Sequence, residues 1–359
     1  MEHLKLCYTP QFDEAAIERN LRALLVSGVL RDRNLDRRIA ALAERFRIYT
    51  AYYPHGLWAP GVVITPEMRN LTEFYLPLYE IHRAFDRLFT IALSFSPFLA
   101  ASTIHNASAW LDALHGLEPV ANSPDPASLL RSLMMDEGLR HRFIFANFMP
   151  ARYGGGFGRY PGQAEFLRRW LVENRSRLAG KVRCLDAACG SGEGTYELAL
   201  FLMKSGFAAD SIHVRGATLE PLELFAAAHC YFPHDPRRTE AYRLHTAPLC
   251  ANGATGKIRF TLEDLIGAAP ASERGYDIIL CNGLLGGPFL HEPRDLVEMV
   301  RRLTGRLSGK GILLAASRFH GGWEKLAPME ALREIFRVCG LRILPVAEGV
   351  AGEKVKGEG

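Results

Sequence analysis

The segment CLDAACGSGEGTYELALFL, residues 184–202, constrains the fold of this chain more than any other part of it. An apolar run typical of a buried strand leads into a glycine-rich turn, and the apolar spacing of a helix follows. Gly190, Gly192 and Gly194 have no Cβ, so a ligand can approach the main chain of this turn. The unit predicts a doubly wound α/β sheet with its ligand at the end of this strand.

The rest of the C-terminal half repeats the alternation of strand and helix. Strands are predicted at 182–188, 212–218, 257–260, 276–282 and 310–316, and helices at 193–205, 221–229 and 293–306. This alternation implies a parallel, Rossmann-like sheet with helices on both faces, over residues 153–350. Residues 231–256 are predicted to form a loop over the sheet edge, and 351–359 a disordered tail.

Residues 1–152 are predicted to form a separate all-helical domain that caps the substrate site. Leu35, Ile39, Leu42 and Phe46 recur at helical spacing and share one face. The domain is also rich in aromatic residues, which either form its own core or line a cavity for a bulky apolar acceptor. These aromatic residues are Phe74, Tyr75, Tyr79, Phe85, Phe89, Phe95 and Phe98.

Charge and cysteine content argue against several classes of protein. The formal net charge is +4, and residues 1–150 carry 15 Lys and Arg against 16 Asp and Glu, so no basic surface for nucleic acid is expected. Seven cysteines without CxxC spacing predict reduced thiols in a cytoplasmic protein, with neither a disulfide framework nor a metal site. The uncharged stretch 88–111 contains Ser, Thr, Asn and His, which favours a buried helix over a membrane span. The oligomeric state stays open.

The turn at 188–194 differs from a dinucleotide-binding loop. It reads AxGxGxG from Ala188 rather than GxGxxG, and Asp186 precedes it in the strand. Glu193 would repel a phosphate at the start of the helix, where an anion otherwise binds well. The turn therefore favours a cofactor that presents a cation or neutral polar groups, such as S-adenosyl-L-methionine. A purely structural turn is the alternative.

Polar residues follow the next three strands. Glu220 is expected to accept hydrogen bonds from the ribose hydroxyls, with a helix-capping role as the alternative. Either Glu263 or Asp264 can accept from the adenine amino group, and we favour Asp264. Asn282 is expected to face the reacting methyl group, and His291 stands where a base or a purely structural residue could lie.

Three stretches together resemble the CheR-type chemotaxis methyltransferases, which are class I S-adenosylmethionine-dependent enzymes. AACGSGEGTYELAL is similar to their A-A-C-S-x-G-E-E motif, YDIILCNGLL to D-x-I-x-C-R-N-V-L, and LSGKGILLAASRF to L-x-P-G-G-x-L. FGRYPGQAEFL is faintly similar to their F-F-R-D-x-x-x-F-x-x-L. The resemblance covers roughly residues 157–320.

The resemblance implies roles for individual residues. Ala188, Gly190, Gly192 and Glu193 would line the methionine part of the cofactor. Asp186, in the strand before the turn, is also expected among the cofactor-binding residues. Glu220 would hold the ribose, and Asn282 would lie by the sulfonium. Arg159 would reach the cofactor carboxylate or an acidic substrate.

The chain departs from this family at the features that select the substrate. Cys281 precedes Asn282 where the family has an arginine, and the expected receptor-docking β-subdomain is absent from the pattern of 231–256. We therefore expect a methyltransferase for an undetermined carboxylate, hydroxyl or amine, on a small molecule or a protein. The alternatives are an inactive CheR-like module that binds the cofactor or S-adenosylhomocysteine and signals to a partner, and a nicotinamide dehydrogenase.

Overall fold

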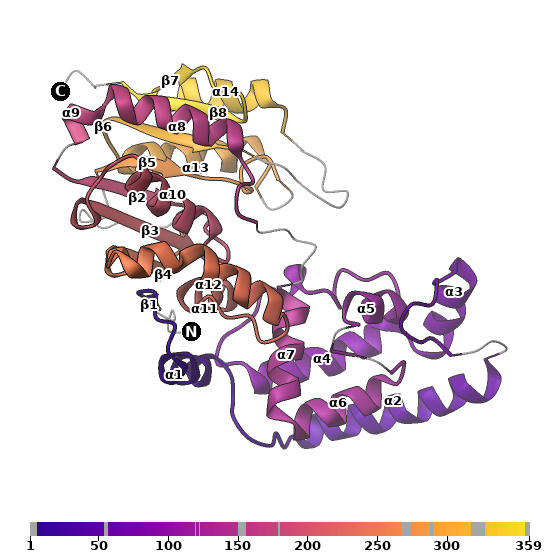
Figure 1. Ribbon diagram of the computed structural model, residues 1–359. Helices are drawn as coiled ribbons and strands as arrows, with labels where there is room; N and C mark the ends of the chain where they lie inside the picture. The colour runs from indigo at the N-terminus through magenta and orange to yellow at the C-terminus, as the bar shows by residue number, and fades with distance from the viewer. Residues whose placement is uncertain are drawn as a thin grey trace. The chain divides into compact units, whose positions relative to one another are not determined.

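The computed structural model describes residues 6–53, 57–118, 120–121, 123–149, 156–178, 180–266, 275–287, 290–316 and 327–355. The chain forms two compact units. The sheet unit comprises Met1–Phe12, Arg152–Cys230 and Glu240–Gly359, and the helical unit comprises Asp13–Ala151 and Tyr231–Thr239 (Figure 1). The helical unit is therefore inserted into the chain of the sheet unit.

The sheet has the order β1-β4-β3-β2-β5-β6-β8-β7. Its strands are β1 Cys7–Tyr8, β2 Val182–Asp186, β3 Ile212–Thr218, β4 Ile258–Leu262, β5 Tyr276–Leu280, β6 Leu307–Ala315, β7 Leu341–Leu344 and β8 Val350–Lys354. Strands β2 to β6 are parallel, whereas β1 and β8 run antiparallel to their neighbours β4 and β6. The order reverses between β2 and β5, which confirms the doubly wound sheet predicted from the sequence.

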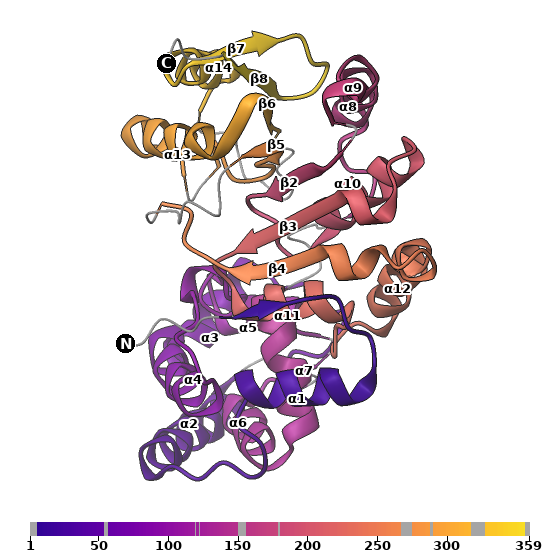
Figure 2. The same cartoon turned by 90° about the vertical axis from the view of Figure 1, so that its left-hand side faces the viewer.

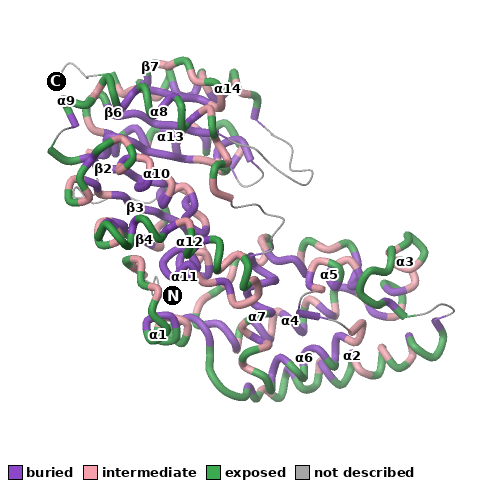
Figure 3. Tube along the Cα trace, in the orientation of Figure 1, coloured by how far each residue is buried: buried purple, intermediate pink, exposed green. Residues whose placement is uncertain are grey.

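Helices cover both faces of this sheet. They are α8 Pro161–Glu173, α9 Arg175–Leu178, α10 Glu193–Lys204, α11 Pro221–His229, α12 Pro236–Ala251, α13 Pro293–Arg306 and α14 Met329–Val338. Helices α10 and α12 lie on one face, and α13 and α14 on the other (Figure 2). The odd-numbered side chains of the central strands, such as Leu185 and Ile279, belong to one apolar core with Leu296 and Val300 of α13. The strands are consequently buried along most of their length (Figure 3).

The helical unit has its own aromatic core. Its helices are α1 Glu14–Leu24, α2 Arg33–Tyr52, α3 Pro66–Tyr75, α4 Leu78–Ala92, α5 Trp110–Gly116, α6 Pro126–Met135 and α7 Glu137–Phe148. Phe85 stacks on Phe143 with 5.5 Å between ring centroids, and Phe89 is also buried. Phe74 and Tyr79, in contrast, are exposed. The aromatic residues of this unit thus divide between a core and its surface.

Four sequence predictions are wrong. Cys7 and Tyr8, placed in the all-helical domain, form strand β1 of the sheet. The stretch 88–111 is not one buried helix, because α4 ends at Ala92 and α5 begins at Trp110. Residues 236–251 form helix α12 rather than a loop, although the helix contains Pro248 and buries few side chains. Residues 351–354 form part of β8 rather than a disordered tail, because Val350 and Ala351 are buried between β6 and β7. The last four residues, 356–359, lie outside the described residues. Within the described ranges, no helix combines the length and the apolar character needed to cross a membrane.

Candidate functional site

The glycine turn follows β2, at the point where the strand order of the sheet reverses. The backbone N–H of Ala187 donates to the carbonyl of Leu280 in β5 at 2.7 Å, and that of Cys189 donates to Ala217 in β3 at 3.0 Å. The turn is thus fixed to the strands on both sides of β2. In open α/β sheets this crevice, at the carboxyl ends of the strands, is where ligands bind.

The three glycines of the turn meet different surroundings. Among the described residues, a Cβ at Gly190 would have only Glu223 Oε1 within 4 Å, at 4.0 Å. A Cβ at Gly192 would lie 3.0 Å from both Ala227 and Phe260, and one at Gly194 would lie 2.8 Å from Asp186. Gly192 and Gly194 therefore serve close packing, and the space that a ligand could use is at Gly190. The sequence alone did not separate these roles.

Asp186 is buried beneath the turn, at 3% exposure. Its carboxylate accepts from the Thr195 hydroxyl at 2.9 Å and from the backbone N–H of Ala188. Burial, with a smaller effect of the Glu193 charge, raises the pKa of Asp186 to about 7 despite these two bonds. Asp186 stabilises the turn from below, while Ala188 and Gly190 are half-exposed above it.

Two carboxyl groups approach the turn from the end of β3. Glu220 is half-buried, and burial together with the charge of Glu223 raises its pKa to about 7. The Thr218 hydroxyl donates to the Glu223 carboxylate at 2.9 Å. The oxygen of this hydroxyl also accepts from the Glu220 backbone N–H at 3.2 Å. The side chain predicted to hold the ribose is therefore accompanied by a second carboxylate, which lies closer to Gly190.

Glu193 is held at the start of α10 by a helix distant in sequence. The Tyr242 hydroxyl of α12 donates to Glu193, whose exposure is only 7%. Phe157 packs edge-on against the Tyr242 ring, with 4.9 Å between centroids, and the N–H of Gly158 donates to Glu197 of α10. The segment that precedes α8 is thus fastened beside the glycine turn.

Asn282 lies beyond the end of β5, where the sequence predicts contact with the reacting group. Its Oδ1 accepts from Gln163 Nε2 at 3.0 Å and from the Ala316 backbone N–H at 2.8 Å. Its Nδ2 donates to Gln163 Oε1 at 2.8 Å. Gln163, near the start of α8, is 3% exposed. A paired amide therefore ties α8 to the carboxyl ends of β5 and β6.

Arg159 and His291 are two further residues predicted for the site, and each contacts a residue next to it in the chain. Arg159 is half-buried on the segment before α8, with its guanidinium carbon 5.5 Å from the centre of the Tyr160 ring. His291 is 36% exposed, and its Nε2 lies 3.5 Å from Glu292 Oε1. Neither placement assigns a chemical role by itself.

The acids after β4 have clearly different environments. Glu263 accepts from Arg215 and, at 3.0 Å, from the buried Arg306, so its carboxylate belongs to an ion-pair network. Asp264 is exposed and accepts from the Ile266 backbone N–H at 2.9 Å. Of the two candidates for the adenine contact, only Asp264 has a carboxylate outside that network.

Sequence reasoning missed Gln163, Tyr242 and Glu197. Gln163 contacts Asn282, 119 residues away, and Tyr242 contacts Glu193 of the turn, whereas Glu197 accepts from Gly158 on the segment before α8. Local patterns contain no signal for such pairs, because neither strand nor helix periodicity specifies a partner on another element.

Two buried cysteines in the same region are not candidates for a nucleophile. Burial raises the pKa of Cys281 to about 12 and that of Cys189 well above its ordinary value.

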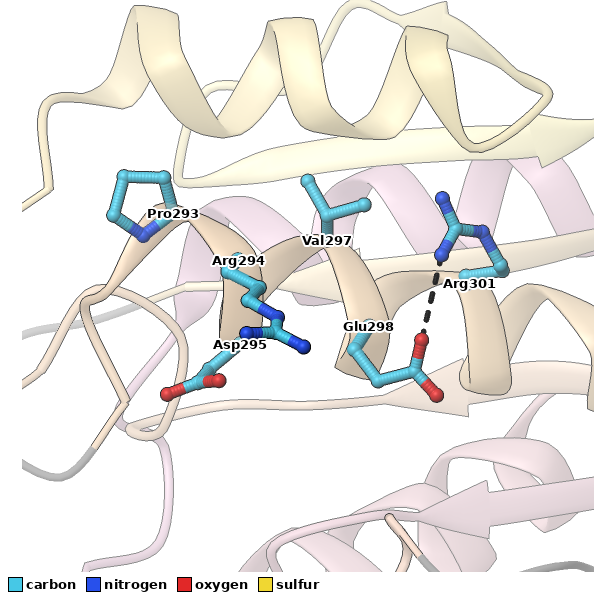
Figure 4. Close-up of a pocket in the computed structure, with 6 residues that line it drawn as sticks. All are labelled: Pro293, Arg294, Asp295, Val297, Glu298 and Arg301. Atoms are coloured by element: carbon cyan, nitrogen blue, oxygen red, sulfur yellow. Dashed lines mark hydrogen bonds and ion pairs between the residues drawn. The ribbon is translucent and has the colours of Figure 1, made fainter.

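A surface hollow lies elsewhere, along α13 (Figure 4). It is lined by Pro293, Arg294, Asp295, Val297, Glu298 and Arg301. Arg301 donates to Glu298 at 3.3 Å, as is common for neighbouring turns of an exposed helix. None of the residues predicted to bind a cofactor lines this hollow, and we place the candidate site at the glycine turn instead.

Comparison with known proteins gives no family. No family model matches the chain, and no curated protein matches it. Among solved structures, a TehB-like SAM-dependent methyltransferase from Corynebacterium glutamicum is 19% identical with a TM-score of 0.32, over 55% of this chain and 100% of that one. A putative O-methyltransferase from Nostoc punctiforme is 8% identical with a TM-score of 0.36, over 60% and 59%.

A third solved structure is the 1,6-didemethyltoxoflavin-N1-methyltransferase of Burkholderia thailandensis with bound 1,6-didemethyltoxoflavin and S-adenosylhomocysteine. It is 14% identical with a TM-score of 0.31, over 56% of this chain and 93% of that one. At such TM-scores these likenesses assign neither a family nor an activity to the chain.

Proposed function

We propose that the chain is an S-adenosylmethionine-dependent methyltransferase whose cofactor lies at the glycine turn. One observation carries the proposal: within the part of the chain that the structure describes, the main chain at Gly190 is open, and the side chain nearest to that opening is the carboxylate of Glu223. A nucleoside with a cationic amino-acid arm fits such a cradle, whereas the pyrophosphate of a dinucleotide would be repelled. When bound, the cofactor would supply a methyl group on a sulfonium, with the sulfur as leaving group that keeps the electron pair of the carbon–sulfur bond.

The charges around the turn support a cationic ligand. Burial raises the pKa of Asp186 and of Glu220, and a neighbouring carboxylate raises it further in each case, Glu193 for Asp186 and Glu223 for Glu220. A bound cation would relieve this repulsion and favour the ionised carboxyls. The similarity of the turn and of the β5 end to the CheR-type motifs points to the same cofactor class, with Ala188 and Gly190 beside the methionine part.

The role of the protein in the reaction is to align the acceptor and to provide a suitable field. Methyl transfer is an in-line displacement, so orientation contributes much of the rate. Glu220 would orient the ribose and Asp264 the adenine, while Asn282, Arg159 and His291 would lie toward the acceptor. His291 would serve as a base only for an acceptor that must lose a proton.

Calorimetric titration with S-adenosylmethionine, S-adenosylhomocysteine and NAD tests this proposal. We expect both sulfur nucleosides to bind and NAD not to bind. Transfer of a labelled methyl group to candidate acceptors then separates an enzyme from a module that only binds the cofactor. Binding of NAD in preference to S-adenosylhomocysteine would remove the basis of the assignment.

A further inference from the structure

The amide pair of Gln163 and Asn282 has a defined polarity. Side-chain amides have two possible orientations, and hydrogen-bond partners decide between them. The Ala316 N–H can only donate, so the atom of Asn282 that lies 2.8 Å from it must be the carbonyl Oδ1. The two bonds with Gln163 then follow, because a flip of either amide would oppose two donors or two acceptors.

This arrangement uses the acceptor capacity of Asn282 completely. A carbonyl oxygen has two lone pairs, and Gln163 and Ala316 occupy both. The amide nitrogen has two hydrogens, and Gln163 Oε1 takes one. The second hydrogen has no partner among the described residues, and Asn282 is half-buried rather than enclosed. Toward a ligand, Asn282 can therefore act as a donor but not as an acceptor.

Asn282 and the glycine turn follow neighbouring strands, β5 and β2, at the same edge of the sheet. Leu280, two residues before Asn282, pairs with Asp186 in the sheet and accepts from the Ala187 N–H. Gln163 belongs to α8, and the N–H of its neighbour Gly162 donates to Glu348 at 2.8 Å. Both amides of the pair thus belong to fixed elements.

We propose that Gln163 is a positioning residue that makes Asn282 a hydrogen-bond donor beside the transferred group, and so selects an oxygen acceptor over an amine. This inference rests on the proposed function. A carboxylate or phenolate oxygen has spare lone pairs that can accept from the Asn282 N–H while another attacks. A neutral amine has a single lone pair, needed for attack, and its N–H groups require an acceptor that Asn282 does not offer.

Two cofactor analogues measure the polarity without the natural acceptor. S-adenosylhomocysteine has no group at the methyl position, and sinefungin has an amino group there, which is a donor. We expect Asn282→Leu, which removes the opposing donor, to improve sinefungin binding relative to S-adenosylhomocysteine by about tenfold. If Asn282 instead offered its carbonyl, the same change would weaken sinefungin selectively, and that result would overturn the proposal. Asn282→Ala provides the same comparison should the leucine variant fail to fold.

The Gln163→Leu variant tests the positioning role. Without Gln163 the second lone pair of Asn282 Oδ1 is free to accept a hydrogen bond, while Ala316 still holds that oxygen, so we expect the ratio of the two dissociation constants to move at least threefold in the same direction. The affinity for S-adenosylhomocysteine itself should change less than threefold. A merely structural role would change both constants together and leave the ratio fixed, which would refute the proposal. The control is Gln11→Leu, since Gln11 is exposed and lies on another segment.

The outcomes also separate this inference from the proposed function. If the wild-type protein binds neither nucleoside in the calorimeter, the methyltransferase assignment fails and the inference fails with it. If S-adenosylhomocysteine binds but neither variant changes the ratio, only the role of the amide pair is refuted. An N-methylated product from a panel of carboxylic acids, phenols and amines would likewise contradict the oxygen preference.

Discussion

Alanine substitutions at two glycines of one turn should separate binding from folding. Gly190 has φ +51° and open space around its missing Cβ. Alanine in this left-handed conformation costs about 1–2 kcal/mol, and no further steric cost arises in the ligand-free protein. We therefore expect Gly190→Ala to lower the free energy of unfolding by about that amount and to weaken S-adenosylhomocysteine binding at least tenfold, about 1.4 kcal/mol.

Gly192→Ala, in contrast, should lose more stability than Gly190→Ala and retain its affinity for S-adenosylhomocysteine. Gly192 has φ +91°, and its new Cβ would lie 3.0 Å from both Ala227 and Phe260, which are fully buried. Overpacking of this kind adds about 1–3 kcal/mol to the backbone cost, for a total loss of about 2–5 kcal/mol. The measurements are chemical denaturation for the free energy of unfolding and calorimetry for affinity.

Gly253→Ala provides the control for backbone strain alone. Gly253 has φ +69°, a Cβ added there would have nothing within 4 Å, and the residue precedes β4 away from the turn. The variant should lose about the same stability as Gly190→Ala and retain its affinity. If Gly190→Ala keeps its affinity, or loses more stability than Gly192→Ala, the assignment of the open space at Gly190 to a ligand is wrong.

Three further predictions concern the acids around the site. Glu220→Gln should weaken S-adenosylhomocysteine binding by about 1–3 kcal/mol through loss of charge-assisted bonds to the ribose, and an unchanged calorimetric affinity would transfer that role to Glu223. Burial raises the pKa of Asp186 to about 7, so the folded protein favours the neutral carboxyl more than the unfolded chain does. The free energy of unfolding should therefore fall as pH rises from about 4 to 7. Denaturation at several pH values should therefore show wild type losing stability relative to Asp186→Asn over that range; a constant difference would contradict the raised pKa. Glu263→Gln should cost about 3 kcal/mol of stability by breaking a buried ion pair while sparing affinity, whereas Asp264→Ala should do the reverse, and the same two assays distinguish them.

The sequence predicts the sheet more closely than the site. The predicted segments 212–218, 221–229 and 293–306 coincide with β3, α11 and α13, because apolar residues alternate with polar ones at the start of the strand and a proline marks the first turn of each helix. Helix α12 was missed because it contains Pro248 and has no apolar stripe. Strand β8 was missed because its apolar part is only Val350 and Ala351, followed by Gly352 and charged residues.

The site depends on pairs that no local pattern encodes. The glycine spacing predicts the turn, but only the packing of Phe260 and Asp186 distinguishes Gly192 and Gly194 from Gly190. Two adjacent acids after β4 look equivalent in sequence, and the difference between them arises from Arg215 and Arg306, which approach from a strand and a helix. Contacts of this kind follow from tertiary placement, so they become visible only with the fold.

Strand β1 has a practical consequence for any attempt to study the sheet unit alone. The carbonyl of Leu6 accepts from the Leu262 N–H at 3.0 Å, and Cys7 and Tyr8 cover the outer side of β4. A fragment that begins at residue 152 would lack this short strand and expose the unpaired hydrogen-bonding groups of β4 to solvent. Such an exposed edge promotes intermolecular pairing and aggregation. A fragment that retains β1 should be less prone to this pairing.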